Sequence, residues 1–195
     1  MAKRARTAAQ AIELEGASSS TTNEADFERF ARLGTIAGYP IVATIVSGAL
    51  SSIDFEEIQG ADYVEAPSWL EGPFVRYLAG EPETFEDVPL VLSGTNFQMR
   101  VWRELRRIPW GRLASYAEVA ERVQVPRGMR AVGAANGANP IPIVVPCHRV
   151  VEGGGKLGGY SGGLDVKRSL LAREGARFVR DHVHMGQLSL FGTTD

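Results

Sequence analysis

The cysteine Cys147 is the only one in this 195-residue chain, and it stands in the stretch IVVPCHRVV at 143–151. A free thiol has a pKa of about 8.5, so a nucleophilic cysteine needs a base that takes its proton. His148 follows directly, and Glu174 falls at the end of a helix expected over 165–174. A carboxylate is unfavourable at that end of a helix, unless it orients a group such as an imidazole. Cys147, His148 and Glu174 therefore have the residue types of a nucleophile, its base and a group that holds the base.

Two properties of this stretch bear on that interpretation. A cysteine between valines is more often a small core residue than a nucleophile. Neighbouring residues of an extended strand point to opposite faces, so Cys147 and His148 would not touch if 143–151 is a strand. A bridging water or a turn at Pro146 would have to connect them, and we expect a water between the two side chains.

Charge is distributed unequally along the chain. Residues 1–96 carry 6 basic and 15 acidic side chains, whereas residues 97–195 carry 15 basic and 8 acidic ones. Within 97–130 there are eight arginines and three glutamates. An acidic half followed by an arginine-rich half predicts two domains, the second facing a polyanion. A solvated charged surface is the alternative.

Composition narrows the class of protein. The hydrophobic fraction of 44% and the charged fraction of 23% are those of an ordinary globular protein. No apolar run approaches the roughly 18 residues of a membrane span, and the start MAKRARTAAQAIELEG lacks the apolar region of a secretory signal. One cysteine cannot form an internal disulfide, which favours the cytoplasm. One cysteine and three histidines do not make a convincing zinc site, so we expect no metal.

The first half of the chain predicts a leader, strands and a helix. Residues 1–25 include GASSSTTNEA and are typical of a mobile leader. Residues 35–58 are rich in valine, isoleucine and threonine around a central Ser-Gly, which predicts a strand pair with a turn. Residues 68–85 predict a short helix followed by a Gly/Pro-rich connection.

The second half predicts helices. The stretches TNFQMRVWREL, from Thr95, and SYAEVAERV, at 115–123, begin with the T-x-x-Q and S-x-x-E patterns of capping boxes. GMRAVGAANGA at 128–138 has almost no long side chain except Arg130. Short helices in an arginine-rich setting predict a helix-turn-helix. The small residues indicate close packing against another helix or close approach to a nucleic-acid groove. A glycine-rich loop at 152–164 could wrap over a flat ligand or serve as a simple linker.

From Gly94 to Gly175 the chain resembles the O6-alkylguanine-DNA alkyltransferases, repair proteins that take an alkyl group from damaged guanine onto their own cysteine. The matching stretches, in order, are GTNFQMRVW, IPWGRLASYAEVA, RAVGAANGANPIPIVVPCHRVV and GGYSGGLDVKRSLLAREG. The resemblance implies an α+β fold: a small ribonuclease-H-like α/β N-terminal domain and a mainly helical C-terminal domain with a winged-helix-like helix-turn-helix. The expected parts are the leader at 1–25, the two domains at 26–92 and 93–180, and a tail at 181–195.

The resemblance also implies a reaction. O6-alkylguanine, and also O4-alkylthymine, would be flipped out of duplex DNA, and Cys147 would accept the alkyl group irreversibly, once per monomeric molecule and without a cofactor. His148 would act as the base through a water, Glu174 would hold His148, and Asn139 would brace the turn. The implied substrate-binding residues are Tyr116, Val150, Gly158, Tyr160 and Ser161, and the implied minor-groove residues are Arg130, Ala131, Ala134, Ala135 and Gly137.

Three other functions are weighed against this one. A non-catalytic relative that only flags alkylated DNA would lack the cysteine. A helix-turn-helix regulator would need polar side chains that RAVGAANGA does not offer. A cysteine hydrolase usually carries its nucleophile at a helix N-terminus rather than inside a stretch such as VVPCHRVV.

The end of the chain carries a separate motif. QLSLF at 187–191 resembles the short peptide by which many bacterial repair proteins dock on the replication sliding clamp. A terminal peptide with alternating apolar anchors suits a surface groove. The alternative is an apolar end that packs on its own domain. The residues of this expected clamp-binding peptide are Gln187, Leu188, Ser189, Leu190 and Phe191.

Overall fold

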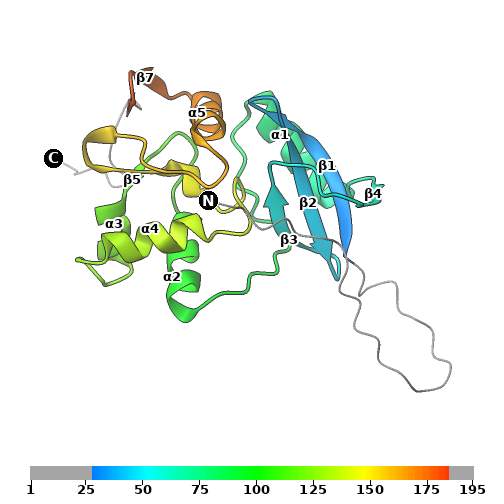
Figure 1. Cartoon of the computed structure of the whole chain (residues 1–195), viewed down its shortest axis with the longest axis horizontal. Helices are drawn as coiled ribbons and strands as arrows, with labels where there is room; N and C mark the ends of the chain where they lie inside the picture. The colour runs from blue at the N-terminus through cyan, green and yellow to red at the C-terminus, as the bar shows by residue number, and fades with distance from the viewer. Residues whose placement is uncertain (1–27, 185–195) are drawn as a thin grey trace.

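The computed structural model describes residues 28–184, so the expected leader at 1–25 and the QLSLF peptide lie outside the described residues (Figure 1). The described part contains helices and small sheets. In chain order the elements are β1 (Arg29–Ile36), β2 (Tyr39–Val46), β3 (Ala49–Asp54), β4 (Tyr63–Val64), α1 (Ser68–Ala79), α2 (Asn96–Leu105), β5 (Ala114–Ser115), α3 (Tyr116–Arg122), α4 (Met129–Gly137), the 3-10 helix η2 (Cys147–Arg149), β6 (Val150–Val151), the 3-10 helix η3 (Gly153–Gly155), α5 (Leu164–Arg173), β7 (Arg177–Val179) and β8 (His182–His184).

The first half is a four-stranded sheet in the order β3-β2-β1-β4. Antiparallel strands β1, β2 and β3 are joined by two-residue turns, Ala37-Gly38 and Ser47-Gly48, in which all four residues have positive φ. Such turns match the twist of a hairpin. The sequence predicted one strand pair within 35–58, whereas the chain forms three strands between 29 and 54. The Ser-Gly turn was expected, and the Ala-Gly turn was missed.

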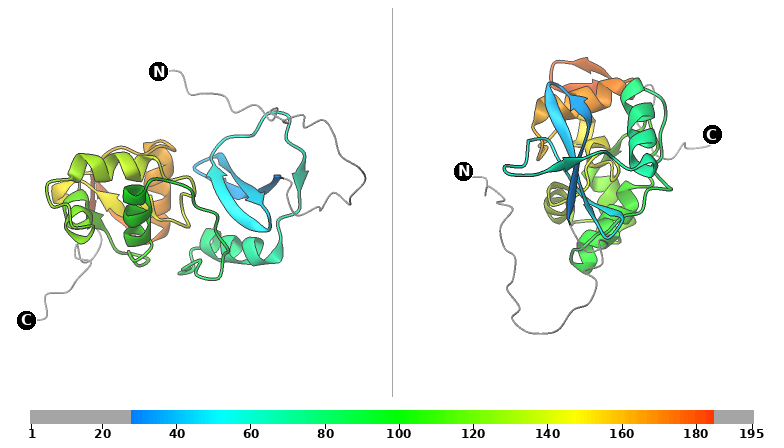
Figure 2. Two further views of the ribbon diagram at one scale, coloured as in Figure 1. Left: turned by 90° about the horizontal axis from the view of Figure 1, so that it is seen from below. Right: turned by 90° about the vertical axis from the view of Figure 1, so that its right-hand side faces the viewer.

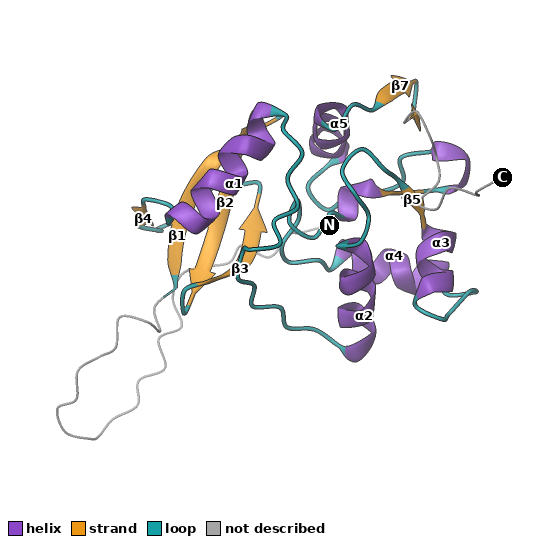
Figure 3. Ribbon diagram, turned by 180° about the vertical axis from the view of Figure 1, so that it is seen from behind, coloured by secondary structure: helices purple, strands orange, loops and turns teal. Residues whose placement is uncertain are grey.

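Helix α1 packs against the sheet, as the view from behind shows (Figure 3). It buries Leu70, Phe74 and Tyr77 and ends at Gly80, whose φ of 86° is left-handed. The helix predicted within 68–85 is therefore confirmed. The connection that follows runs along the outer edge of the sheet, where Leu50 N donates to Pro89 O and Val91 N donates to Leu50 O. This connection covers the backbone of β3, which would otherwise be an open edge.

The second half is mainly helical. Thr95 and Ser115 form the predicted capping boxes with Gln98 and Glu118, at the starts of α2 and α3. Helix α2 buries Trp102 against α4, and its indole Nε1 donates to Ala135 O at 2.9 Å. Helices α3 and α4 are joined by a short turn and pack on each other, as expected for a helix-turn-helix (Figure 1).

The two halves share buried residues. Figure 2 shows the sheet and the helices of the second half as neighbouring bodies. One apolar cluster nevertheless runs from Ala31 in β1, through Phe74 in α1, to Val145 and Leu170 in the second half. The segment 141–150, which includes the cysteine, is buried throughout and lies between them. Within 28–184 no helix has the length and apolar content needed to cross a membrane.

Candidate active site

The cysteine begins a turn of 3-10 helix. Cys147–Arg149 form η2 directly after Pro146, and Cys147 N donates to Val145 O at 2.7 Å. Of the two alternatives, a bridging water or a turn at Pro146, the chain forms the turn, and the centre of 143–151 is not extended. Pro140, Pro142 and Pro146 supply no N–H to a strand ladder, which explains why the chain turns here. The turn has only three residues, so Cys147 does not stand at the N-terminus of an α-helix, where a cysteine hydrolase usually carries its nucleophile.

Two buried asparagines hold this turn. Asn139 Nδ2 donates to Val145 O at 2.8 Å, and Asn139 Oδ1 accepts from Ile141 N at 3.1 Å. Asn136, at the end of α4, donates from Nδ2 to the Cys147 carbonyl at 3.3 Å. Sequence analysis singled out Asn139 but missed Asn136, whose signal was an amide among the small residues of GMRAVGAANGA.

Glu174, the residue that caps the C-terminus of α5, lies at the centre of a buried polar cluster. His148 Nε2 lies 2.8 Å from its Oε1. Arg149 donates to both carboxylate oxygens, from Nε to Oε2 at 2.9 Å and from Nη2 to Oε1 at 3.0 Å. Gly111 N donates to Oε2 at 3.3 Å. Sequence analysis paired Glu174 with His148 and missed Arg149, although the arginine stands next to His148 in the chain.

The charges in this cluster are balanced without protonating the carboxylate. Burial alone would raise the pKa of Glu174, but His148 and Arg149 outweigh it and lower the pKa to about 2. Burial lowers the pKa of His148 below its ordinary 6.5, and the nearby carboxylate offsets only part of that effect. At neutral pH the cluster thus holds a carboxylate, a guanidinium and a neutral imidazole.

The neutral imidazole has one nitrogen available. Nε2 faces the carboxylate and is therefore the nitrogen that carries the proton. Nδ1 is the acceptor in that tautomer, and it is buried with no hydrogen-bond partner among the described residues. Burial raises the pKa of the Cys147 thiol, although the polar groups of Asn139 and Tyr160 offset part of the effect. The cluster therefore combines a protonated thiol with an imidazole able to accept its proton.

Two tyrosines lie beside the thiol. Burial raises the pKa of Tyr116, and the neighbouring Cys147 raises it further. The pKa of Tyr160 is raised well above its ordinary value by the same two causes, and its buried hydroxyl has no partner within the described residues. Gly158 lies beside the Tyr116 ring with a φ of 66°. Glycine suits this position because side chains with a Cβ rarely adopt that backbone conformation.

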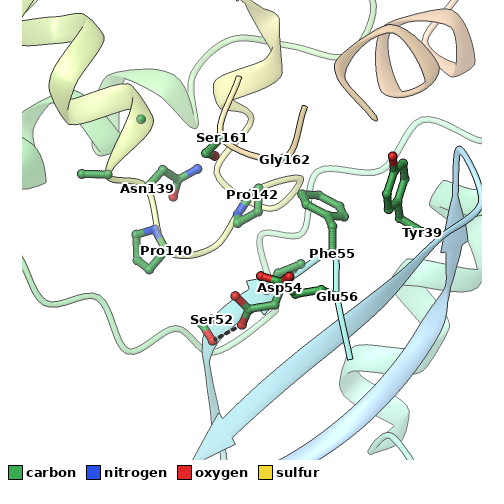
Figure 4. A pocket seen from close by; sticks show the side chains of 13 residues that line it. Tyr39, Ser52, Asp54, Phe55, Glu56, Asn139, Pro140, Pro142, Ser161 and Gly162 are labelled. Atoms are coloured by element: carbon green, nitrogen blue, oxygen red, sulfur yellow. Dashed lines mark hydrogen bonds between the residues drawn. The ribbon is translucent and has the colours of Figure 1, made fainter. Parts of the chain in front are cut away.

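Ser161 lies next to a pocket of about 420 Å³ between the two halves of the chain (Figure 4). One wall is formed by residues 137–142 and the glycine-rich loop, the other by Tyr39 and the end of β3. Gly162 is required here, because a Cβ would lie 2.6 Å from the Phe55 ring. The residues that line the pocket include Tyr39, Ser52, Asp54, Phe55, Glu56, Asn139, Pro140, Pro142, Ser161 and Gly162.

Helix α4 presents a surface of small residues. Its exposed positions include Arg130, Ala131, Ala134 and Gly137. Ala135 does not belong to this surface: it is only 2% exposed and packs toward α2. Including Ala135 among the groove-facing residues was therefore an error, caused by grouping the residues by size rather than by helical period.

Lys167 was missed by sequence analysis. Its Nζ donates to the carbonyls of Val150, at 2.7 Å, and Leu157. Burial lowers its pKa to about 8. Val150 itself is fully buried, so only its backbone is available to a ligand. Within 28–184 no group of three or more histidine, cysteine or acidic side chains is arranged to hold a metal ion.

The Glu174 cluster predicts a pH-dependent loss of stability in one variant. Glu174→Gln leaves Arg149 buried without a counter-charge, so we expect the free energy of unfolding at pH 7 to fall by about 3 kcal/mol. A carboxyl whose folded pKa is depressed stabilises the fold above its unfolded pKa and loses that contribution as pH falls. The deficit should therefore shrink between pH 4.5 and 2, as measured by urea unfolding across that range.

The matched control is Glu65→Gln, an exposed carboxyl outside the cluster. It should change the free energy of unfolding by less than about 0.5 kcal/mol. A Glu174→Gln deficit no larger than that of the control, or one that stays constant with pH, would contradict the assignment of the buried charge.

Comparisons with known proteins identify relatives of this architecture. Residues 96–176 match the family model of the 6-O-methylguanine DNA methyltransferase DNA-binding domain. A methylated-DNA–protein-cysteine methyltransferase of Methanosarcina acetivorans is 43% identical over 150 residues, which cover 70% of this chain and 94% of the relative. One from Mycolicibacterium paratuberculosis is 58% identical over 98 residues, 50% of this chain and 59% of the relative.

A solved structure is similar in fold. The crystal structure of Mycobacterium tuberculosis OGT in complex with DNA has a TM-score of 0.66 and 38% identity, covering 75% of this chain and 93% of that one. The match to the Mycolicibacterium paratuberculosis relative spans less than two thirds of that protein, whereas the match to the Methanosarcina relative covers nearly its whole length. By that match the chain belongs to the methylated-DNA–protein-cysteine methyltransferase family.

Proposed function

We propose that this protein repairs DNA by direct reversal, moving the alkyl group of an O6-alkylguanine to Sγ of Cys147. The observation that carries the proposal is the contact of His148 with Glu174, beside the single cysteine, in a member of this family. A bond forms between Sγ and the alkyl carbon, and the bond from that carbon to O6 breaks. The electron pair stays with the guanine, which gains the proton that the thiol loses. The thioether has no easy route back, so each molecule reacts once.

The proton leaves the thiol through His148. With Nε2 facing Glu174, the lone pair of Nδ1 is the acceptor, and a water between Nδ1 and Sγ would carry the proton across. Because Cys147 is buried and its pKa is raised, the thiolate forms when the base and the alkyl carbon are both in place. This arrangement limits reactions of the thiol with other electrophiles. A cytoplasmic location would keep it reduced.

The groups around the thiol suit a flipped alkylated base. Tyr116 would donate to a ring nitrogen of guanine and Ser161 to O6, which helps the guanine to leave. Gly158 and Tyr160 would line the space that the flipped base occupies beside the thiol. The carbonyls of Cys147 and Val150 would accept from the exocyclic amine. The Val150 carbonyl accepts from Lys167 and has a second lone pair, whereas the Cys147 carbonyl, which accepts from Asn136 Nδ2 and Val150 N, would have to share one. O4-alkylthymine presents the same kind of alkyl-oxygen bond and would react similarly.

The DNA partner is proposed to meet α4. Its small exposed residues Ala131, Ala134 and Gly137 would let the helix enter the minor groove, and Arg130 would fill the space left by the flipped nucleotide. A relative, the OGT of Mycobacterium tuberculosis, has been solved in complex with DNA. Extruding the base costs a few kcal/mol, which arginine–phosphate contacts offset in a salt-dependent way.

The finer description of the fold is also a proposal. We infer a ribonuclease-H-like domain at 26–92 and an alkyl-acceptor domain at 93–180 that includes a winged-helix-like helix-turn-helix. The sheet with α1 on one face and the packing of α3 on α4 support it. The protein would act as a monomer, because one molecule supplies the thiol, the base and the DNA-facing helix.

The reaction predicts a stoichiometric adduct. After incubation with duplex DNA containing O6-methylguanine, intact-mass measurement should show a gain of one methyl group, about 14 Da, on Cys147 and no second turnover. Cys147→Ser should show no gain. A hydrolase would leave the protein mass unchanged while it consumed substrate repeatedly. That result, or a modification at another residue, would refute the proposal.

The DNA interface predicts a substrate-dependent effect. Arg130→Ala should slow transfer from O6-methylguanine in duplex DNA about tenfold or more, because the flipped nucleotide loses the side chain that replaces it. Transfer from free O6-benzylguanine should change by less than about twofold, since no duplex is opened. Both rates are measured by quenched-flow labelling. Arg29→Ala, an exposed arginine of the sheet, is the control; equal losses with both substrates would argue against a role in base flipping.

The expected clamp-binding peptide remains a proposal, because 187–191 lie outside the described residues. Deleting 187–191 should abolish retention of the protein on an immobilised bacterial sliding clamp while the rate of alkyl transfer stays within about twofold. A scrambled version of the same five residues is the control. Retention of the deleted protein equal to that of the full chain would end the idea.

A further inference from the structure

One buried side chain of the first half reaches the base of the active site. The Tyr77 hydroxyl, on α1, donates to Glu174 Oε1 at 3.3 Å across 97 positions of sequence. The side chain is fully buried. Neither the proton transfer nor the binding of the base uses this hydroxyl, and no motif surrounds Tyr77 in the sequence.

The contact falls on the carboxylate oxygen that also faces the imidazole. Oε1 lies 2.8 Å from His148 Nε2, and Arg149 Nη2 donates to it at 3.0 Å. Tyr77 therefore shares an acceptor with the histidine. The hydrogen bond from the phenol reduces the negative charge on Oε1, and so weakens the attraction between Oε1 and a protonated His148.

The phenol is held in that position by aromatic packing. The Tyr77 ring meets Trp110 edge to face, with centroids 5.3 Å apart and an interplanar angle of 82°. It also packs against Phe85, at a centroid distance of 5.6 Å. One position beyond Tyr77, the carbonyl of Leu78 accepts a hydrogen bond from Arg173, the neighbour of Glu174. The end of α1 and the end of α5 are thus tied together at two points.

We propose that Tyr77 is a positioning residue, through which the first half of the chain holds the Glu174 carboxylate toward His148 and weakens the attraction of that carboxylate for a protonated imidazole. The inference rests on the proposed function and deepens it. It gives the four-stranded half a direct part in the proton transfer, by way of α1, in addition to its packing role.

The acid limb of the pH–rate profile is the property that Tyr77 should change. Arg149 from η2 and Lys167 from α5 also face His148, and Cys147 lies beside it in the chain. Arginine stays protonated in proteins, and burial lowers the pKa of Lys167 only to about 8. Burial raises the pKa of Tyr77 well above its ordinary value, and Glu174 raises it further, so it remains a donor. The loss of rate on acidification below pH 6.5 therefore reports the protonation of His148.

The experiment compares Tyr77→Phe with the intact chain, using O6-methylguanine in duplex DNA. Without the hydroxyl, Oε1 attracts the imidazolium more strongly, so the midpoint of the acid limb should move up by about half a pH unit. The rate one pH unit below the original midpoint then falls about threefold, while the rate above pH 8 stays within about twofold. The control is Tyr63→Phe, which removes another hydroxyl contact of the first half, the one with Ile58 N at 2.9 Å.

A second variant keeps the packing intact. Replacing Tyr77 with 3-fluorotyrosine retains the ring and makes the phenol a stronger donor, so the midpoint should move the other way, to lower pH. The proposal is overturned by an unchanged midpoint in both variants, by an equal shift in Tyr63→Phe, or by a loss of rate that is uniform with pH. Failure of the intact chain to methylate Cys147 would instead refute the proposed function.

Discussion

The structure depends on one buried carboxylate that must be kept charged. A carboxylate removed from water is tolerated only where donors satisfy it on all sides. Glu174 meets this condition with His148, Arg149, Gly111 and Tyr77, which come from η2, from the loop after α2 and from α1. Three segments that are distant in sequence must therefore converge at the end of α5. Their convergence also fixes where the turn after Pro146 places the cysteine.

The same constraint determines how the thiol is kept until it is used. Burial disfavours both a thiolate at Cys147 and an imidazolium at His148, so the resting site carries neither. Because Arg149 already neutralises Glu174, the carboxylate orients the imidazole without taking its proton. The site is thereby held in the one protonation state from which the thiol proton can move to His148. If the proposed reaction consumes the nucleophile, such a state is an advantage, since every unproductive reaction would consume a molecule.

Whether the sequence predicts a contact of this arrangement depends on how many residues separate its two partners in the chain. Thr95 and Ser115 predicted the starts of α2 and α3 because a capping box is complete within four residues. Glu174 was found because a carboxylate at a helix C-terminus is unfavourable without a partner. Around Cys147 the β-branched residues favoured a strand and Pro146 favoured a turn, and only the folded chain, which forms the turn, decides between them. Tyr77 could not be found from its surroundings in the sequence, because its partner lies 97 positions away.

The first half of the chain has the less specific motifs, and it contacts the site through residues that are distant from it in sequence. The stretch around the cysteine carries the recognisable sequence, and several of its residues hold the turn or the carboxylate: Asn139 through Val145 O, and His148 and Arg149 through Glu174. The contacts of the sheet half with the site include the hydroxyl of Tyr77, the ring of Phe55 beside Tyr160 and Gly162, the N–H of Ile53 on Pro140 O, and the carbonyl of Leu78. Many sheets with a helix on one face could supply those groups at those points. The first half can therefore vary widely in sequence while remaining bound by the same carboxylate, provided that α1 still delivers a donor to it.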